Sequence, residues 1–543
     1  MPQTHEVTNQ APPLTGHDVA ADPALIEGLH RQGAGWSEDS LHTLGTLAGT
    51  EHFQELGRLA NENEPVLRTH DRYGNRIDEV EFHPAWHELM ETAVANGLHA
   101  APWRDERPGA HVARAAQLYV WGQVEPGHIC PISMTYAAVP ALRANPALAA
   151  AYEPLLAART YDFGLRAPAG KRGLIAGMSM TEKQGGSDVR TNTTRAVPAG
   201  EDGTYALTGH KWFTSAPMSD LFLTLAQAPG GLSCFLLPRV LPDGTRNRIH
   251  LQRLKDKLGN RSNASAEIEY EGAVGYLVGE EGRGVRTIID MVNLTRLDCV
   301  LGAATGMRAG LIRAVHHTAH RAAFGAPLID QPLMRNVLSD LAVESEAATT
   351  VAIRLAGATD RAARGDAAEE SFRRLALAVT KYWVCKRGPV HAAEALECLG
   401  GNGYVEESGM PRLYREAPLM SIWEGSGNVS ALDALRAMAR QPDSVEAFFA
   451  EIDQAAGSDR RLDASVAELK KELGDPAELE FRTRRIVESM ALVLQGSLLV
   501  RYGSPAADAF CASRLGGDHG RAFGTLPAGT ATAPLIDRAR HAV

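Results

Sequence analysis

The strongest constraint in this sequence is a change of pattern between about residues 183 and 287. This stretch holds short runs rich in β-branched and aromatic residues, separated by turn signals such as Pro229-Gly230-Gly231 and Asp243-Gly244. Such runs are typical of antiparallel strands. The sequence on either side places apolar residues three and four positions apart, which indicates amphipathic helices. We therefore expect an α+β protein that is mainly helical, with one small antiparallel β-domain.

The length requires more than one hydrophobic core, because 543 residues exceed what a single core usually serves. Helical runs at 297–321, 333–364 and 371–399 have the length of helices in a four-helix bundle. The breaks in pattern predict a mostly disordered lead at 1–36, an N-terminal helical domain at 37–180, the β-domain at 181–287, a helical bundle at 288–440 and an extra C-terminal helical domain at 441–543.

The charge balance argues against a surface that is basic throughout. Lys and Arg number 55 against 65 Asp and Glu, for a net charge of −10, which disfavours coating of nucleic acid or anionic membrane. From Phe481 onward, however, eight basic residues stand against four acidic ones, although residues 441–543 together hold twelve against fifteen. A local basic surface at the C-terminal end therefore stays open.

Location and metal content are constrained by what the sequence lacks. No basic run followed by an apolar core opens the chain, and the apolar stretch Met490–Val500 is shorter than the roughly 20 residues a membrane helix needs. Six scattered cysteines without C-x-x-C spacing indicate reduced, mostly buried thiols and a cytoplasmic protein. His316 and His320 have i, i+4 spacing without an H-E-x-x-H motif, so we favour a solvated or subunit-interface face and expect no metal.

Two motifs in the β-rich stretch could bind a ligand. In Met180–Asp188, the paired glycines Gly185 and Gly186 would let backbone amides approach a phosphate, and Ser187 adds a hydroxyl donor. Taken alone, this motif is better explained by a plain turn. In Trp212-Phe213-Thr214, adjacent aromatic residues on a strand point to opposite faces, so one could pack inward while the other contacts a flat ligand. Taken alone, this motif is better explained by a tryptophan in the core.

Two further motifs lie in the second helical part. Gly400, Gly401 and Gly403 form a glycine-rich loop, of which helix capping explains only one glycine. Glu424 follows two apolar residues and precedes Gly425. An apolar setting would raise the pKa of such a carboxyl toward that of a useful general base.

Taken together, the motifs resemble the acyl-CoA dehydrogenase family over roughly residues 70–440. The resemblance rests on the order and spacing of Thr181-Glu182…Gly186-Ser187-Asp188, Lys211-Trp212-Phe213-Thr214, Arg321–Leu328, Gly400-Gly401-Asn402-Gly403-Tyr404 and Trp423-Glu424-Gly425-Ser426. The segments His83–Met90 and Leu254–Ser265, with the C-terminal extension, resemble the AidB branch of that family, flavoproteins of the DNA alkylation response.

The resemblance implies an FAD cofactor and a set of site residues. The residues expected to contact FAD are Met178, Met180, Thr181, Gly186, Ser187, Trp212, Phe213, Thr214, Arg321, Phe324, Gly400, Gly401, Trp423, Ser426 and Asn428. In the family, the positions of Arg321, Phe324, Gly400 and Gly401 serve the flavin of a neighbouring subunit, which implies a homotetramer. Arg296 matches a substrate contact, and Glu424 matches the catalytic base.

The implied reaction needs these residue types. Oxidation beside a thioester carbonyl requires a carboxylate that removes a proton and an acceptor for hydride, which flavin supplies and no side chain can. One branch of the family takes its base from the position of Thr295, and threonine cannot serve. Glu424 is therefore the expected base.

Two functions follow from the sequence. The first is an FAD-dependent dehydrogenase of an acyl thioester or related small molecule. The second is a flavoprotein that binds or protects double-stranded DNA through its C-terminal domain, with catalysis residual or lost. An acyl-CoA oxidase on the same scaffold is a third possibility.

Overall fold

The structure is a computed structural model that describes residues 4–200 and 203–540. The expected lead and C-terminal domain also include residues 1–3 and 541–543, which lie outside these ranges. The described chain divides into two compact units. One consists of the residues up to Glu51 with Pro108–Gln123 and the residues from Cys299 onward; the other consists of His52–Arg107 and Val124–Asp298.

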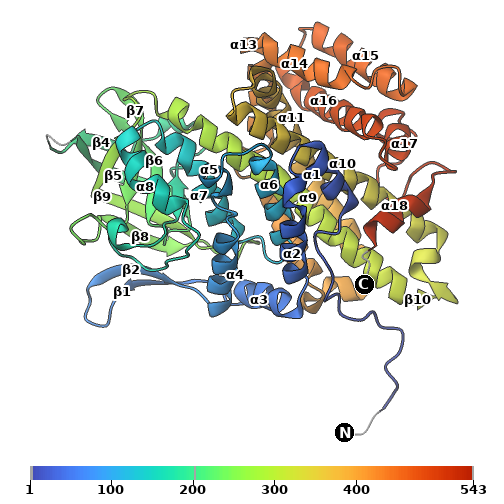
Figure 1. Cartoon of the computed structure of the whole chain (residues 1–543), viewed down its shortest axis with the longest axis horizontal. Coiled ribbons are helices and arrows are strands. Elements are labelled where there is room, and N and C mark those ends of the chain that lie inside the picture. The colour runs from blue at the N-terminus through green and yellow to red at the C-terminus, as the bar shows by residue number, and fades with distance from the viewer. Residues whose placement is uncertain (1–3, 201–202, 541–543) are drawn as a thin grey trace. The chain divides into compact units, whose positions relative to one another are not determined.

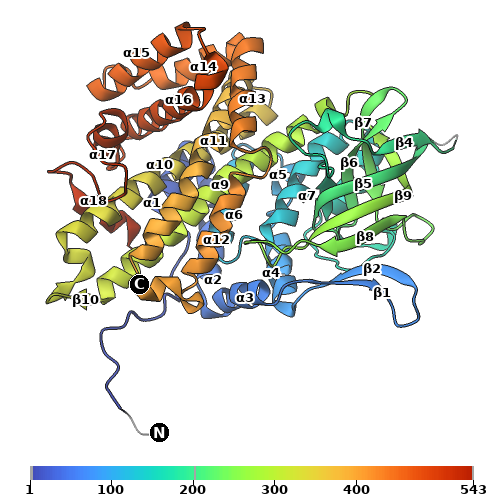
Figure 2. The same ribbon diagram turned by 180° about the vertical axis from the view of Figure 1, so that it is seen from behind.

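The second unit contains the expected β-domain (Figure 2). Its strands are β3 (Ala176–Ser179), β4 (Arg195–Pro198), β5 (Thr204–Ser215), β6 (Leu221–Ala228), β7 (Gly231–Pro238), β8 (Ile249–Leu254) and β9 (Ser265–Val278). The order β3-β6-β4-β5-β9-β7 has a further β6–β7 pairing, so five strands close on themselves. Most pairs are antiparallel, but β3 and β4 run parallel to β6, which corrects the expectation of a purely antiparallel domain.

The same unit also contains α-helices, some of which share a hydrophobic core with the sheet. They are α3 (Glu51–Glu62), α4 (Pro84–Ala95), α5 (Ala101–Arg104), α7 (Ile129–Leu142) and α8 (Pro146–Leu156). Helix α7 is apolar on nearly all sides, and its Tyr136 and Leu142 share a core with Leu223 of β6. A hairpin of β1 (Val66–His70) and β2 (Arg76–Glu81), which we did not expect, interrupts the helical N-terminal region.

Long helices dominate the first unit (Figure 1). They are α9 (Gly284–His320), which begins in the other unit, α10 (Pro332–Ala363) and α11 (Ala367–Glu397), and the shorter helices α12 (Met410–Met420) and α13 (Gly427–Arg440) follow them. The side chain of Asp366 caps α11 by accepting hydrogen bonds from the amides of Ala368 and Glu369. Helices from the N-terminal part of the chain belong to the same unit: α1 (Pro23–Arg31), α2 (Glu38–Ala48) and α6 (Ala110–Trp121). The mainly helical α+β class is thus confirmed.

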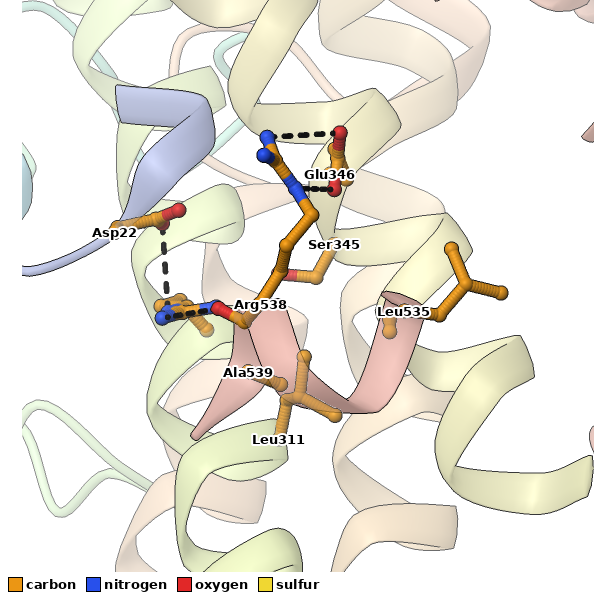
Figure 3. A pocket seen from close by; sticks show the side chains of 9 residues that line it. Asp22, Leu311, Ser345, Glu346, Leu535, Arg538 and Ala539 are labelled. Carbon is orange, nitrogen blue, oxygen red and sulfur yellow. Dashed lines mark hydrogen bonds and ion pairs between the residues drawn. The ribbon is translucent and has the colours of Figure 1, made fainter. Parts of the chain in front are cut away.

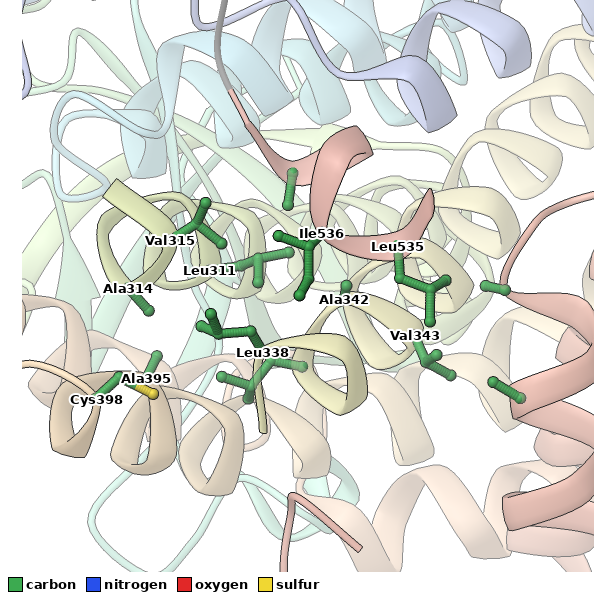
Figure 4. Close-up of a cluster of buried hydrophobic side chains, with 14 of the residues drawn as sticks. Leu311, Ala314, Val315, Leu338, Ala342, Val343, Ala395, Cys398, Leu535 and Ile536 are labelled. Atoms are coloured by element: carbon green, nitrogen blue, oxygen red, sulfur yellow. The ribbon is translucent and has the colours of Figure 1, made fainter. Parts of the chain in front are cut away.

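Five α-helices follow α13 in the described chain, and the last three of them share a hydrophobic core with the long helices. They are α14 (Pro442–Asp453), α15 (Arg460–Gly474), α16 (Leu479–Arg501), α17 (Ala507–Phe510) and α18 (Thr532–Ala539). Leu535 and Ile536 of α18 pack against Leu311 of α9 and Leu338 of α10 (Figure 4). The last helix is therefore part of the bundle's own core.

Ordered structure starts earlier in the chain than the sequence indicates. Residues 23–31 form α1, with Leu25 and Leu29 fully buried, where a disordered lead was expected. Pro23 stands at the first turn and the Asp22 side chain accepts a bond from the Ala24 amide, so the helix has a clear start signal. Even Asn9 contacts the bundle, because its side chain bonds the backbone of Ala322 in both directions.

The structure also bears on the cysteines and on the question of a membrane-spanning helix. All six cysteines are free and buried, as reduced core thiols should be. Within residues 4–200 and 203–540, no helix combines the length and the apolar character needed to cross a membrane.

Candidate functional site

A buried ion pair organises the glycine-rich loop of the β-domain. The Lys211 Nζ of β5 donates to Glu182 Oε1 at 2.9 Å, and both side chains are fully buried. Glu182 also accepts hydrogen bonds from the amides of Thr193 and Thr194, at 2.7 and 3.1 Å, from the Thr193 hydroxyl at 3.0 Å and from Gln184 Nε2 at 2.8 Å. Burial alone would raise the pKa of Glu182, but the Lys211 ammonium and these bonds hold that pKa well below its ordinary value. The loop is thus anchored by a permanent carboxylate.

The loop presents open donors beyond this anchor. Gly185 has φ +138°, and a Cβ at Gly186 would lie 2.5 Å from Thr181 Oγ1, so this part of the loop suits glycine. Ser187 is exposed, and its hydroxyl has no hydrogen-bond partner among residues 4–200 and 203–540. A bare backbone with a free hydroxyl is what a diphosphate group requires. These residues fit the diphosphate of FAD.

The aromatic motif lies on a bulge, which corrects the predicted strand geometry. Lys211 pairs with Ile268 and Thr214 with Ala266 on β9, so β5 carries one extra residue between them. Trp212 and Phe213 consequently do not alternate between core and surface: Trp212 is half-buried and Phe213 is 51% exposed. The tryptophan of this motif is not a core residue, contrary to what the motif alone favours.

Trp212 is tied to the loop and flanked by cations. Its amide donates to the Thr181 carbonyl at 2.8 Å, which links the two candidate motifs. Lys255 Nζ lies 3.3 Å from the centre of the Trp212 ring, a cation–π arrangement. Buried Thr214 bonds Ser179 of β3 through its hydroxyl at 2.5 Å. The structure thus brings Thr181, Trp212 and Thr214 together with β3, which carries Met178.

The other residues of this unit that we expected to contact FAD or substrate lie in ordinary core or helix positions. Met178 and Met180 are partly buried against the core that α7 shares with the sheet. Arg296 is buried on α9. The hydroxyl of Thr295 bonds the carbonyls of Met291 and Val292 in its own helix, at 3.2 and 3.1 Å, as expected for a residue without a catalytic role.

Glu424 lies in a strained turn of the first unit, between α12 and α13. Its φ is +55°, unusual for a residue with a Cβ, and Gly425 follows at φ +105°. Glu424 and Trp423 are half-buried, whereas Ser426 and Asn428 are exposed at the start of α13. The side chain of Ser426 makes no capping bond to that helix. Backbone strain of this kind is concentrated at functional sites.

The positions assigned to a neighbouring flavin are exposed. Phe324 is 100% exposed at φ +53°, in the turn of the β10–β11 hairpin (Ala322–Ala323 and Ala326–Pro327). Gly400 and Gly401 are exposed, and a Cβ at either would meet nothing within 4 Å. The Arg321 guanidinium donates to the Asn9 carbonyl at 2.8 Å, a contact that sequence reasoning missed.

Most basic residues at the C-terminal end of the chain are neutralised by ion pairs. Six of the eight basic residues after Phe481 pair with acidic side chains: Arg482, Arg485, Arg501, Arg514, Arg538 and Arg540. Arg538 pairs with both Glu27 and Glu346, and its pair with Glu346 lies at the wall of a small cavity (Figure 3). Arg484 and Arg521 are exposed and have no ion pair in the described part of the chain. The excess of four basic residues therefore does not form a free positive surface.

Comparison with known proteins decides the family. Family models match the N-terminal domain of the adaptive response protein AidB at residues 9–163, the acyl-CoA dehydrogenase middle domain at 177–273 and the acyl-CoA dehydrogenase C-terminal domain at 282–439. A relative from Escherichia coli (strain K12), provisionally named as the acyl-CoA dehydrogenase AidB, is 49% identical over 94% of each chain. The chain belongs to the acyl-CoA dehydrogenase family.

Solved structures agree with this assignment. Caenorhabditis elegans ACDH-11 in complex with C11-CoA has a TM-score of 0.86 at 27% identity, covering 94% of each chain. An acyl-CoA dehydrogenase complexed with FAD from Bacillus anthracis has a TM-score of 0.66 at 17% identity, over 80% of this chain and 81% of that one, and shares the fold. As an acyl-CoA dehydrogenase family member, the protein is an FAD-dependent oxidoreductase of the type that acts on CH–CH groups.

The residues that sequence reasoning missed are those that hold the motifs in place. Glu182 and Lys211 belong to recognised motifs, but nothing in their spacing shows that they pair across 29 positions. Lys381 of α11 donates to the Gly425 carbonyl beside Glu424, across 44 positions. Lys381 has one sequence signal, because it is the charged residue in the mostly apolar run 375–385, whereas Glu182 and Lys211 stand among polar neighbours and have no such signal.

Proposed function

We propose that the protein catalyses α,β-oxidation of an acyl thioester or a related small molecule, with Glu424 as base. The observation that carries this proposal is the turn at Glu424, where a carboxylate in left-handed backbone geometry follows the half-buried Trp423. A surface glutamate has no need of such a conformation, because it costs free energy. The carboxylate would remove a proton from the carbon beside the thioester carbonyl.

The β-domain loop supports the cofactor side of the proposal. Bound FAD would supply the acceptor for the hydride that leaves the neighbouring carbon. The free Ser187 hydroxyl and the open amides beside Gly186 would hold its diphosphate, and Trp212 and Thr214 would contact its ring system. The Glu182–Lys211 pair would keep these groups in place without touching the flavin.

The substrate class is supported by a relative. ACDH-11, whose structure holds C11-CoA, is similar over 94% of this chain. We propose an acyl-CoA thioester for this protein as well, with buried Arg296 near the bound acyl group, as the family motif implies.

We also propose assembly into a homotetramer. Phe324, Leu333 and Tyr404 of the first unit are 100%, 83% and 82% exposed. Large apolar side chains exposed to this degree are typical of protein interfaces. Burial on a neighbouring subunit would bring Arg321, Phe324, Gly400 and Gly401 to that subunit's flavin.

The alternative is a DNA-binding or DNA-protecting flavoprotein of the alkylation response. It is supported by similarity to AidB over 94% of the chain and by the C-terminal helices. The basic excess supports it less than the sequence suggested, because only Arg484 and Arg521 among the basic residues after Phe481 lack an ion pair in the described chain. Six buried free cysteines support a cytoplasmic location for either function.

Anaerobic bleaching of the flavin by acyl-CoAs of increasing chain length tests the proposal. A dehydrogenase loses its flavin absorbance with at least one of them. If none bleaches the flavin while DNA shifts in a gel at low salt, the alternative function replaces the first.

A further inference from the structure

Helix α11 contains a lysine whose burial needs an explanation. The Lys381 side chain belongs to a residue that is 1% exposed, and its ammonium donates to the carbonyl of Gly425. It makes no ion pair in the described part of the chain. An ammonium has three donors, and burying it with one hydrogen bond and no carboxylate is unfavourable.

The acceptor of that bond follows Glu424 directly. Glu424 has φ +55° and Gly425 has φ +105°, so two consecutive residues leave the right-handed region. The Gly425 carbonyl also accepts a bond from the Ser430 hydroxyl of α13, at 3.3 Å. Donors from α11 and α13 thus converge on one peptide group, and strained backbone persists only where its surroundings fix it in this way.

Packing holds the far side of the turn. A Cβ at Gly427 would lie 2.6 Å from Lys386 Cε and 3.7 Å from Tyr382 Cε2, so the first residue of α13 rests against the same face of α11. Tyr382 is in turn held by Arg484 of α16, whose Nε donates to its hydroxyl at 3.0 Å. The turn therefore has a rigid support, in which Lys381 supplies the hydrogen bond to Gly425.

The charges around Lys381 do not explain its presence. Lys386 of α11 interacts electrostatically with both Lys381 and Arg484, and all three are cations. Burial lowers the pKa of Lys386, and the positive charges of Arg484 and Lys381 lower it further. A buried cation among cations adds little to stability, and a hydrophobic side chain of equal length would fill the space. The hydrogen bond from Lys381 to the Gly425 carbonyl is therefore what explains a lysine at this position.

We infer that Lys381 is a positioning residue for Glu424: its bond to the Gly425 carbonyl fixes the left-handed turn from which the carboxylate projects. The inference rests on the proposed role of Glu424 as base. It assigns to α11 a part in the reaction that no motif of this sequence indicates.

The test compares Lys381→Met with Lys386→Met in the FAD-loaded protein. Methionine matches the length of lysine but cannot donate. Lys386 packs against Gly427 but makes no hydrogen bond to the turn in the described part of the chain, so Lys386→Met keeps the packing and controls for loss of a positive charge beside the turn. We expect Lys381→Met to keep its FAD and its KM for the best acyl-CoA but to lose at least about tenfold in kcat, because small displacements of a reacting group are costly. Exchange of the α-protons of that thioester in D2O should fall by the same factor. Lys381→Arg, which keeps a donor, should recover part of both rates.

Amide hydrogen exchange over residues 421–430 gives a readout that is independent of activity. We expect faster exchange in Lys381→Met than in wild type or Lys386→Met. The inference is wrong if Lys381→Met has the kcat and the amide exchange of wild type. It is also wrong if Lys381→Met loses FAD and cooperative melting in parallel with kcat, because Lys381 would then have only a structural role. If wild type and Glu424→Gln turn over alike, the proposed base is wrong, while the amide exchange still reports whether Lys381 holds the turn.

Discussion

Glu182 and Lys211 form an ion pair at 2.9 Å in which neither side chain reaches solvent. Lys211→Met would leave the Glu182 carboxylate buried without its cation. Loss of one partner of such a pair destabilises a protein by about 3–5 kcal/mol. We expect a lower free energy of unfolding in urea and a lower FAD content, because Glu182 anchors the loop that contains Ser187.

The control for this prediction is Lys183→Met, which removes an exposed lysine from the same loop. It should leave stability and FAD content near wild type. The double variant Glu182→Met with Lys211→Met removes both charges and should recover part of the lost stability. Equal effects of Lys183→Met and Lys211→Met would contradict the anchoring role.

Exposed Phe324 gives a prediction about assembly. Phe324→Asn removes the apolar side chain but tolerates φ +53°, because asparagine accepts left-handed geometry more readily than other residues. We expect smaller particles in light scattering after size exclusion, an unchanged far-UV spectrum and weaker FAD retention. A tetramer that survives this change at micromolar concentration would show that Phe324 is not at an interface.

The C-terminal arginines separate DNA binding from stability. Arg514 is 9% exposed and pairs with Asp340 at 2.5 Å and Glu344 at 3.1 Å. We expect Arg514→Ala to lower the melting temperature, because buried Asp340 loses its cation and Glu344 keeps only Arg387. If DNA binds at this end, Arg484→Ala with Arg521→Ala should weaken a gel shift and reduce its salt dependence. A shift that is insensitive to both exposed arginines would locate any DNA contact elsewhere.

Buried His391 gives a prediction about pH. Its Nε2 donates to the Leu341 carbonyl at 3.1 Å, and burial lowers its pKa to about 4. The unfolded chain binds a proton at this residue below about pH 6.5 and the folded chain does not, so stability falls as the pH drops from 6.5 toward 4. This residue alone should account for about 2 kcal/mol between pH 7 and pH 5. Urea unfolding at both values should show a smaller difference in His391→Gln than in wild type.

The sequence predicted the elements whose pattern is local. Long helices such as α10 and α11 follow from periodicity, and the turn at Pro229-Gly230 separates β6 from β7 as expected. The β1–β2 hairpin was missed, although Gly74-Asn75 between alternating runs is a signal for one. Helix α1 was also missed, despite Pro23 after a capping Asp22.

Non-local geometry could not be predicted. The bulge at Trp212 and Phe213 depends on how β5 pairs with β9, and so the exposure of the two rings could not be deduced from alternation. The ion pairs of Arg514 and Arg538 depend on how the last helices pack against α10. A charge count along the chain cannot show which basic residues are already neutralised.

The most direct test of the account is stopped-flow bleaching of the flavin, under anaerobic conditions, in wild type, Glu424→Gln and Glu424→Asp. Glutamine keeps the shape of the side chain and removes the base, so we expect a loss of about a hundredfold or more in the bleaching rate, with FAD content unchanged. Aspartate keeps a carboxylate on a shorter side chain and should lie between the two. Bleaching of Glu424→Gln at the wild-type rate would contradict the central claim that Glu424 is the base.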